Sequence, residues 1–188
     1  MLRDTAAAGA VVLKGYLDRC LRRIRSSPFS QAQVGVDPAS SQVGPKDVLV
    51  HLTQSSLIRS VAERQNLQIV GAGMSPGGGT VDFSQGVLSE VYWVRVKNLG
   101  NDAPSRGKVL ANLAIHEIAH NKCQRIPNLD PVSEVHGNGG GGLLATGVTP
   151  ALARMGTLLP ANEQFLAKYL ARDVPQYSFW LFNPGLGF

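Results

Sequence analysis

The N-terminal end of the chain carries a clear helical pattern. Between Thr5 and Ser26, apolar side chains recur every three or four residues, and basic side chains occupy most of the other positions around the helix. The apolar positions are Leu13, Tyr16, Leu17, Cys20, Leu21 and Ile24. We interpret this segment as a basic amphipathic helix whose apolar stripe docks on the rest of the protein. The alternatives are contact with an anionic membrane and a targeting or loading role with a partner.

A change of pattern follows this helix. Residues 26–47 combine prolines, a glycine and several serines with neither helical nor strand periodicity, which is typical of a linker or an extended wrap. We therefore divide the chain into an N-terminal helix and linker, residues 1–46, and a main domain, residues 47–188.

The main domain mixes helical and strand-like segments. Asp47 is a suitable N-cap and predicts a helix that continues to about Arg64. The glycine-rich segment 71–79 is expected to be a hairpin connection or loop, because Pro76 stands where a dinucleotide fingerprint needs its third glycine. The remaining segments predict strands at Leu67–Val70, Thr80–Phe83 and Val91–Lys97, and helices at about Arg106–Gln124 and Ala161–Arg172.

Length and composition fit one globular domain. The chain has 188 residues, of which 44% are hydrophobic and 16% charged, so neither a collagen-like nor a disordered chain is expected. Lys14 interrupts the best apolar run, Ala6 to Leu13, so no transmembrane segment is expected. Asp4 makes the N-terminus a poor signal peptide. Cys20 and Cys123 exclude a disulfide framework, although one disulfide stays open. We expect a cytoplasmic protein or one exported by a non-classical route.

The positive charge is concentrated at the N-terminal end. The formal net charge is +5, and residues 1–26 contribute +4 of it through six basic and two acidic side chains. The main domain is therefore nearly neutral and lacks the charge that a nucleic-acid-binding face needs. We expect no nucleic-acid partner.

The most informative segment is His116-Glu117-Ile118-Ala119-His120, inside the predicted helix 106–124. Residues four apart on a helix are separated by about 40°, so both imidazoles project from one face within reach of a single metal ion. Glu117 lies about 100° further round, where it can take a proton from a metal-bound water. The pattern predicts two metal ligands and a general base.

These five residues resemble the HExxH signature of the zincin metallopeptidases, a large group of families. The resemblance implies an α+β fold in which a small mixed sheet packs on the active-site helix and glycine-rich loops complete the site. Residues 47–188 would then form a zincin-like metallopeptidase domain. Its substrate, an extended protein or peptide, would lie along an edge strand, for which Val91–Lys97 is our candidate.

A catalytic zinc normally has three protein ligands and a water, so a third ligand is required. We favour His136, which follows His120 by sixteen positions and precedes a glycine-rich turn, because imidazole is the commonest ligand in such sites. Glu134 would give the gluzincin ligand set, and Asp130 resembles the aspzincin arrangement. The compact metzincin pattern is absent, because Cys123 and Ile126 occupy its later positions.

Several further residues have both a functional and an ordinary interpretation. Met155 is either a Met-turn beneath the metal or, more commonly, a core methionine. Cys123 is expected to be a small buried hydrophobe rather than a zinc ligand, Lys122 to face water, and His51 to be structural. Tyr169 and Tyr177 are the tyrosines considered as partners for an oxyanion.

These observations predict a hydrolase: a zinc metallopeptidase in which Glu117 is the general base and a zinc-bound water the nucleophile. Two alternatives stay open. One is a catalytically inactive metal-binding or structural module, and the other is an effector toxin that is delivered into another cell and uses the same zinc site.

Overall fold

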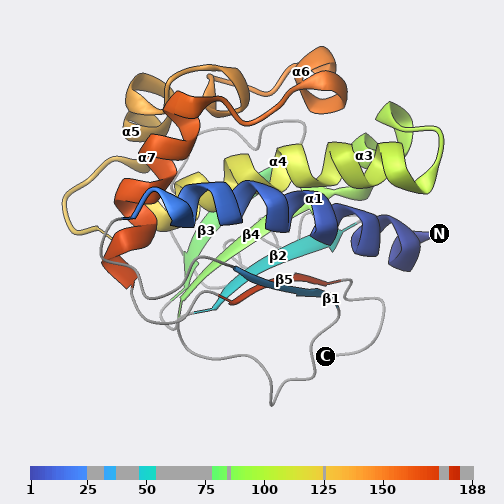
Figure 1. Cartoon of the computed structure of the whole chain (residues 1–188), viewed down its shortest axis with the longest axis horizontal. Helices are drawn as coiled ribbons and strands as arrows, with labels where there is room; N and C mark the ends of the chain where they lie inside the picture. The colour runs from blue at the N-terminus through green and yellow to red at the C-terminus, as the bar shows by residue number, and fades with distance from the viewer. Residues whose placement is uncertain are drawn as a thin grey trace.

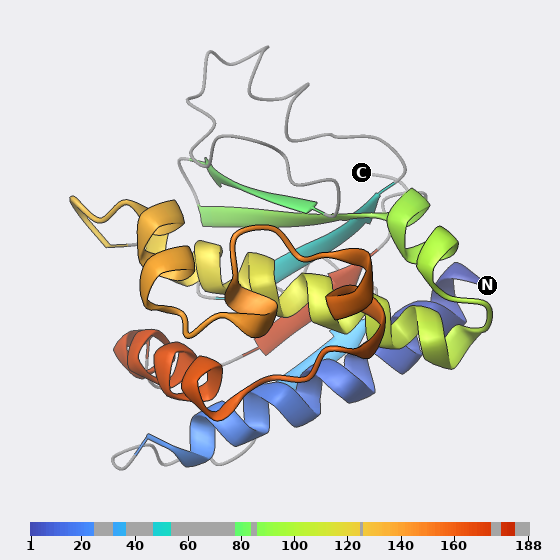
Figure 2. The ribbon, with the colours of Figure 1, turned by 90° about the horizontal axis from the view of Figure 1, so that it is seen from above.

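A computed structural model describes residues 1–24, 32–36, 47–53, 78–83, 86–124, 126–173 and 178–182. In this part of the chain, the helices pack against one face of a five-stranded mixed sheet (Figures 1 and 2). The combination of a small mixed sheet with packed helices confirms the α+β class.

The sheet has the strand order β1-β5-β2-β4-β3. Neighbouring strands run parallel except at one edge, where β3 pairs antiparallel with β4. The elements are, in chain order, α1 (Leu2–Arg22), β1 (Gln33–Val36), β2 (Val48–Thr53), β3 (Gly78–Phe83), β4 (Gly86–Tyr92), α3 (Trp93–Leu99), α4 (Ala103–Gln124), α5 (Pro131–Asn138), η2 (Gly142–Leu144), α6 (Pro150–Met155), α7 (Pro160–Leu170), η3 (Ala171–Asp173) and β5 (Ser178–Phe182).

The N-terminal helix α1 packs its apolar stripe against α4 and the sheet (Figure 1). Five of the six predicted apolar positions are buried, and Ile24 packs against the core from a partly buried position. The docking interpretation of this helix is therefore confirmed. Ion pairs from Arg19 and Arg23 to Glu163 add a polar connection between α1 and α7.

Glycine permits the close approach of α1 and α4. A Cβ atom added at Gly107 would lie 2.6 Å from the Cβ of Ala8 and 2.7 Å from the backbone nitrogen of Gly9. Backbone atoms cannot move aside as a flexible side chain can, so the two helices would have to separate. A Cβ at Gly15, elsewhere on α1, would meet nothing within 4 Å.

We expect Gly107→Ala to lower the free energy of unfolding by about 2–3 kcal/mol, because overpacking a close helix contact has this cost. Gly15→Ala is the matched control, and we expect it to raise stability by about 0.5–1 kcal/mol through its better helix propensity. Urea denaturation of both variants measures the difference. Equal stability of the two variants would contradict the close contact.

Helix α4 is the central element of the helical layer. It contacts β4 and β3 on one side, α1 on another, and α5, α6 and α7 on the remaining side. Every residue from Val109 to Ala119 is buried, as expected for a helix enclosed on all sides. The helix begins three residues before its predicted start and ends at the predicted residue, and α7 likewise confirms the last predicted helix.

Two predicted elements are wrong. The helix predicted from Asp47 begins instead as strand β2, in which Val48, Val50 and Leu52 join the core with a period of two residues. Strands on both sides of β2 complete its backbone hydrogen bonds, and a strand in that position tolerates the continuous apolar run that resembled a helix.

The strand predicted at Val91–Lys97 ends at Tyr92, and α3 follows at once. In α3, Val96 is buried whereas Val94 and Lys97 are exposed, which fits a helix. The strand was predicted because β-branched and aromatic residues are abundant in this segment. Strand β4 also lies inside the sheet, so it is not the expected edge strand. The edge at this end of the sheet is β3, which confirms the strand predicted at Thr80–Phe83.

The predicted strand Leu67–Val70, most of the predicted linker and most of the glycine-rich segment 71–79 lie outside the described residues. Within the described residues, the helices are too short or too polar to cross a lipid bilayer.

Candidate metal centre

Helix α4 presents two histidines on one face, as the sequence predicts. His116 and His120 are separated by one helical turn, and their Nε2 atoms are 3.1 Å apart. The His116 side chain is 3% exposed, whereas His120 is partly exposed. The pair therefore lies at the boundary between the core and the protein surface.

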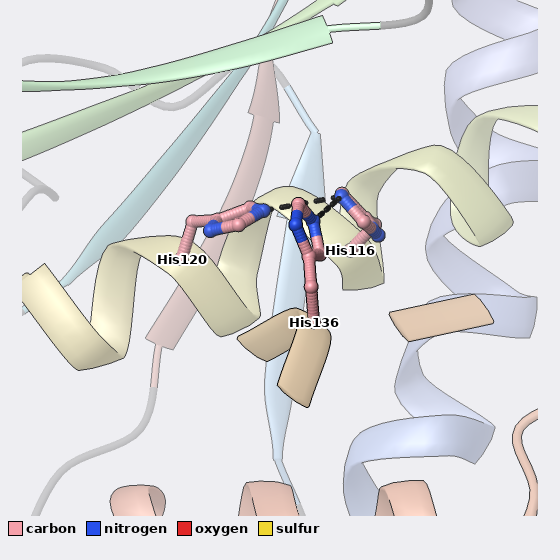
Figure 3. Close-up of side chains that lie close together, drawn as sticks. All are labelled: His116, His120 and His136. Atoms are coloured by element: carbon pink, nitrogen blue, oxygen red, sulfur yellow. Dashed lines mark hydrogen bonds between the residues drawn. The ribbon is translucent and has the colours of Figure 1, made fainter. Parts of the chain in front are cut away.

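The third histidine comes from α5, the next helix of the chain. Asp130 caps the start of α5 by accepting a hydrogen bond from the Val132 backbone N–H at 3.0 Å, and Pro131 occupies the first helical turn, where its missing N–H costs nothing. His136 lies near the end of this helix, and its Nε2 is 3.5 Å from the Nε2 of His116. Figure 3 shows the three rings pointing toward one another.

The three imidazoles form one compact cluster. The ligand atoms of His116, His120 and His136 all lie within 4.8 Å of one another. Within the described residues, this is the one group of three or more histidine, cysteine or acidic side chains close enough to hold a metal ion. The structure thus brings together the three predicted metal ligands.

The backbone fixes the orientation of His116. Its Nδ1 lies 2.7 Å from the carbonyl oxygen of Leu143, and because a carbonyl can only accept, Nδ1 carries the proton and Nε2 presents a lone pair to the cluster. Burial lowers the pKa of His116 to about 4. At neutral pH the ring is therefore uncharged, which is the form that binds metals.

The same conditions hold for the other two rings. Burial is the main reason that the pKa of His120 falls to about 3, and the neighbouring His116 lowers it further. A backbone hydrogen bond with Pro131, whose only polar backbone group is its carbonyl, acts in the opposite direction. Burial also lowers the pKa of His136. All three imidazoles are therefore uncharged at pH 7.

Asp130 and Glu134, the two alternatives for the third metal ligand, both have hydrogen-bond partners outside the histidine cluster. Asp130 accepts hydrogen bonds from Val132 and Ser133 at the start of α5, and these hold the pKa of its carboxyl below the usual range. Its negative charge favours the protonated form of His120 and His136, which partly offsets the lowering of their pKa values by burial. Asp130 is close enough to influence the cluster without belonging to it.

Glu134 connects α5 to α7. Its carboxylate accepts hydrogen bonds from the Tyr169 hydroxyl and from Asn138 Nδ2, the latter at 2.7 Å, and Lys168 Nζ lies 3.4 Å away. These hydrogen bonds lower the pKa of the Glu134 carboxyl, and the one from Tyr169 has the largest effect. The arrangement connects the helix that carries His136 to α7, and it engages the hydroxyl of Tyr169, one of the two tyrosines that the sequence offers for an oxyanion role.

Glu117 is buried, with 4% of its surface exposed. Its backbone carbonyl accepts a hydrogen bond from the hydroxyl of Ser89 on β4 at 3.4 Å. Helix geometry places its side chain about 100° from His116 and on the same side of α4 as Asn121, which donates a hydrogen bond to the Ser89 hydroxyl at 3.3 Å, so this side of α4 faces β4. Glu117 thus directly follows His116 in the chain and lies on the side of α4 that faces β4.

The structure decides four of the ordinary interpretations. Cys123 is a buried core residue whose pKa burial raises to about 12, as expected for an inert thiol. Met155 is 83% exposed at the end of α6, so it is neither a Met-turn nor a core methionine.

The prediction that Lys122 faces water is wrong, because this residue is buried. His51 is buried on β2, and its Nδ1 lies 3.4 Å from Oε1 of Glu90, a position consistent with the predicted structural role. Tyr177 lies outside the described residues.

Two contributors to the site were not found from the sequence. The Leu143 carbonyl is a backbone group and has no residue-type signal, and Asn162 reaches the site only through the fold. The glycines before Leu143 were the available signal, because Gly140, Gly141 and Gly142 all adopt a positive φ that other residues rarely tolerate. Such a run indicates a backbone shape that is required at this point.

A comparison with protein-family models finds no match for the chain, and comparisons with curated proteins and with solved structures find none either. The function is therefore argued from the histidine cluster and its surroundings.

Proposed function

We propose that the protein is a zinc-dependent metallopeptidase of the zincin type, with His116, His120 and His136 as zinc ligands and Glu117 as the general base. The observation that carries this proposal is the convergence of three neutral imidazoles, two of them from an HExxH helix, on one point. The carboxylate of that motif lies on the same helix, directly after the first ligand.

The donor set fits zinc. Tetrahedral zinc with nitrogen ligands at 2.0–2.1 Å needs donor atoms about 3.4 Å apart. The Nε2 separations of 3.1 Å and 3.5 Å from His116 to the other two rings lie close to this value. The ligand atoms of His120 and His136 lie within 4.8 Å of each other, so side-chain rotation would bring this third pair to the spacing around a bound ion. His120 and His136 are both partly exposed, which favours an open fourth position. A structural zinc would normally have a fourth protein ligand instead.

In the proposed reaction, the chain's own residues position the metal and move one proton. Zinc, when bound, supplies a Lewis acid that acidifies water and polarises a carbonyl. Glu117 accepts a proton from the attacking water and returns it to the leaving amine nitrogen, so the carboxylate ends the cycle as it began. The Leu143 carbonyl keeps His116 in the tautomer that directs Nε2 to the metal.

The peptide substrate is proposed to bind along β3. This strand is last in the order of the described sheet, and among the described residues no strand pairs with its outer side. The strand predicted at Leu67–Val70, which could form a hairpin with β3, lies outside the described residues. An extended peptide can add to such an edge through backbone hydrogen bonds, which do not depend on its sequence. Helix α4, which carries Glu117 and two of the histidines, contacts β3.

Elemental mass spectrometry of protein purified without chelators tests the metal centre. We expect one zinc per chain, loss of the metal in His116→Ala, and retention in His51→Gln, the control that alters the one histidine outside the cluster. Hydrolysis of a mixed peptide library should stop after chelation and return with added zinc. Protein without zinc would favour a binding or structural module, and zinc without hydrolysis would favour a catalytically inactive metal-binding protein.

A further inference from the structure

Asn162, in the first turn of α7, is completely buried, and both the nitrogen and the oxygen of its side-chain amide are hydrogen-bonded. Its Oδ1 accepts a hydrogen bond from the Leu159 backbone N–H at 3.0 Å. Its Nδ2 donates to the carbonyl oxygens of Gly139 and Gly141, at 2.6 Å and 2.9 Å. A buried amide satisfied at every position holds its partners in one arrangement.

The two carbonyls belong to the two segments that reach the metal ligands. Gly139 is the C-cap of α5 and follows His136 by three residues. Gly141 precedes Leu143 by two residues, and it is the Leu143 carbonyl that orients His116. One side chain on α7 thus fixes the end of the helix that carries one ligand and the loop that directs another.

This loop needs an external anchor. Gly140, Gly141 and Gly142 have φ values of +82°, +70° and +56°, and consecutive glycines lose more conformational freedom on ordering than other residues do. Local sequence alone does not select this shape. The hydrogen bonds from Asn162 do, because they join two carbonyls of the loop to the rigid start of α7.

We propose that Asn162 is a positioning residue of the metal centre, acting on His116 through Leu143 and on His136 through Gly139. This inference rests on the proposed metal centre for its effect on zinc, but its effect on His116 is independent of zinc. Removing a partner that hydrogen-bonds directly to a metal-bound histidine typically lowers metal affinity by about 10- to 100-fold, and Asn162 is proposed to hold such a partner, the Leu143 carbonyl, in place.

The first test compares two buried asparagines. Asn112 is also completely buried, accepts a hydrogen bond from the Tyr16 hydroxyl at 2.7 Å and donates to backbone carbonyls at the end of α6. Its bonds hold no residue that we assign to the metal centre. In chelator competition, we expect Asn162→Ala to weaken zinc binding at least about 10-fold and Asn112→Ala to weaken it less than about threefold. Equal losses in both variants would overturn the positioning role.

A second pair of variants decides the question if Asn162→Ala does not fold. Gly141 and Gly147 both have a positive φ, +70° and +74°, and a Cβ at either would meet nothing within 4 Å. A positive φ disfavours alanine at both positions, and at Gly141 the ψ of −152° adds to this strain, but only Gly141 lies in the loop that Asn162 anchors. We expect Gly141→Ala to weaken zinc binding by about 10-fold and Gly147→Ala to leave it unchanged. The opposite order would overturn the proposal.

A readout on the metal-free protein separates this inference from the proposed function. In the wild type, the His116 Nδ1–H bonded to Leu143 should give a slowly exchanging imidazole proton in NMR spectra. Asn162→Ala or Gly141→Ala should accelerate its exchange, and the two controls should not. If the wild type binds no zinc, the proposed function fails while this measurement still tests Asn162. If zinc binds and exchange and affinity are unchanged in both variants, the positioning role alone fails.

Discussion

Replacement of Glu117 by glutamine is expected to abolish peptide hydrolysis while the protein keeps its zinc. Glutamine has nearly the same shape, but its amide cannot accept a proton from water at neutral pH. General-base catalysis contributes about 10²- to 10⁴-fold to the rate, so kcat should fall by at least about 100-fold. Zinc content should stay at the wild-type value, because the three imidazoles are unchanged.

The matched control for this variant is Glu90→Gln. Glu90 is also a buried carboxylate, but it pairs with His51. Because its neighbour Ser89 contacts α4, alternation along the strand places Glu90 on the opposite face of the sheet. The folded fraction of Glu90→Gln should keep its kcat. Undiminished hydrolysis by Glu117→Gln would remove this residue from the mechanism, and loss of zinc would give it a structural role instead.

The predictable part of the site follows from local geometry. His116, Glu117 and His120 lie within five residues, so helix periodicity alone determines their relative directions, and no tertiary contact is needed to foresee them. His136 was inferred from its residue type and from the glycines that follow it. The structure brings it to the cluster because Asp130 and Pro131 begin a short helix at the right place.

The parts that were mispredicted depend on partners remote in sequence. Residues 48–53 form a strand because β4 and β5 flank them on both sides, and this context outweighs a good N-cap residue such as Asp47. Trp93–Leu99 is helical although its composition favours a strand, and this helix packs against α4, which is more remote in the chain, with Val96 in the core. Sequence windows contain no information about these partners.

The outer contacts of the site illustrate the same limit. Leu143 is 27 residues from His116, and the hydrogen bond between them uses a backbone carbonyl that every residue type offers. Asn162 lies 23 residues from Gly139, to which it donates. Its place at the start of a predicted helix indicates a capping role, which it has through Leu159. Only the packing of α7 against the glycine loop shows its second role.

The second large effect is expected for His136→Ala, which should weaken zinc binding by more than about 100-fold. Loss of an outer-shell partner alone costs about 10- to 100-fold, and this variant removes a ligand. His136 is partly exposed at the end of an eight-residue helix, so its removal leaves no core cavity and the protein should remain folded. Chelator competition gives the affinity, and circular dichroism verifies the fold.

Asp130→Asn and Glu134→Gln provide the comparison that identifies the third ligand. Both keep the shape of the side chain, and both carboxylates already have hydrogen-bond partners in α5 or α7. We expect each to change zinc affinity by less than about 10-fold, the lower limit for outer-shell partners. If His136→Ala binds zinc normally while one of these variants does not, the carboxylate is the ligand, and the cluster would then have to rearrange when it binds the metal.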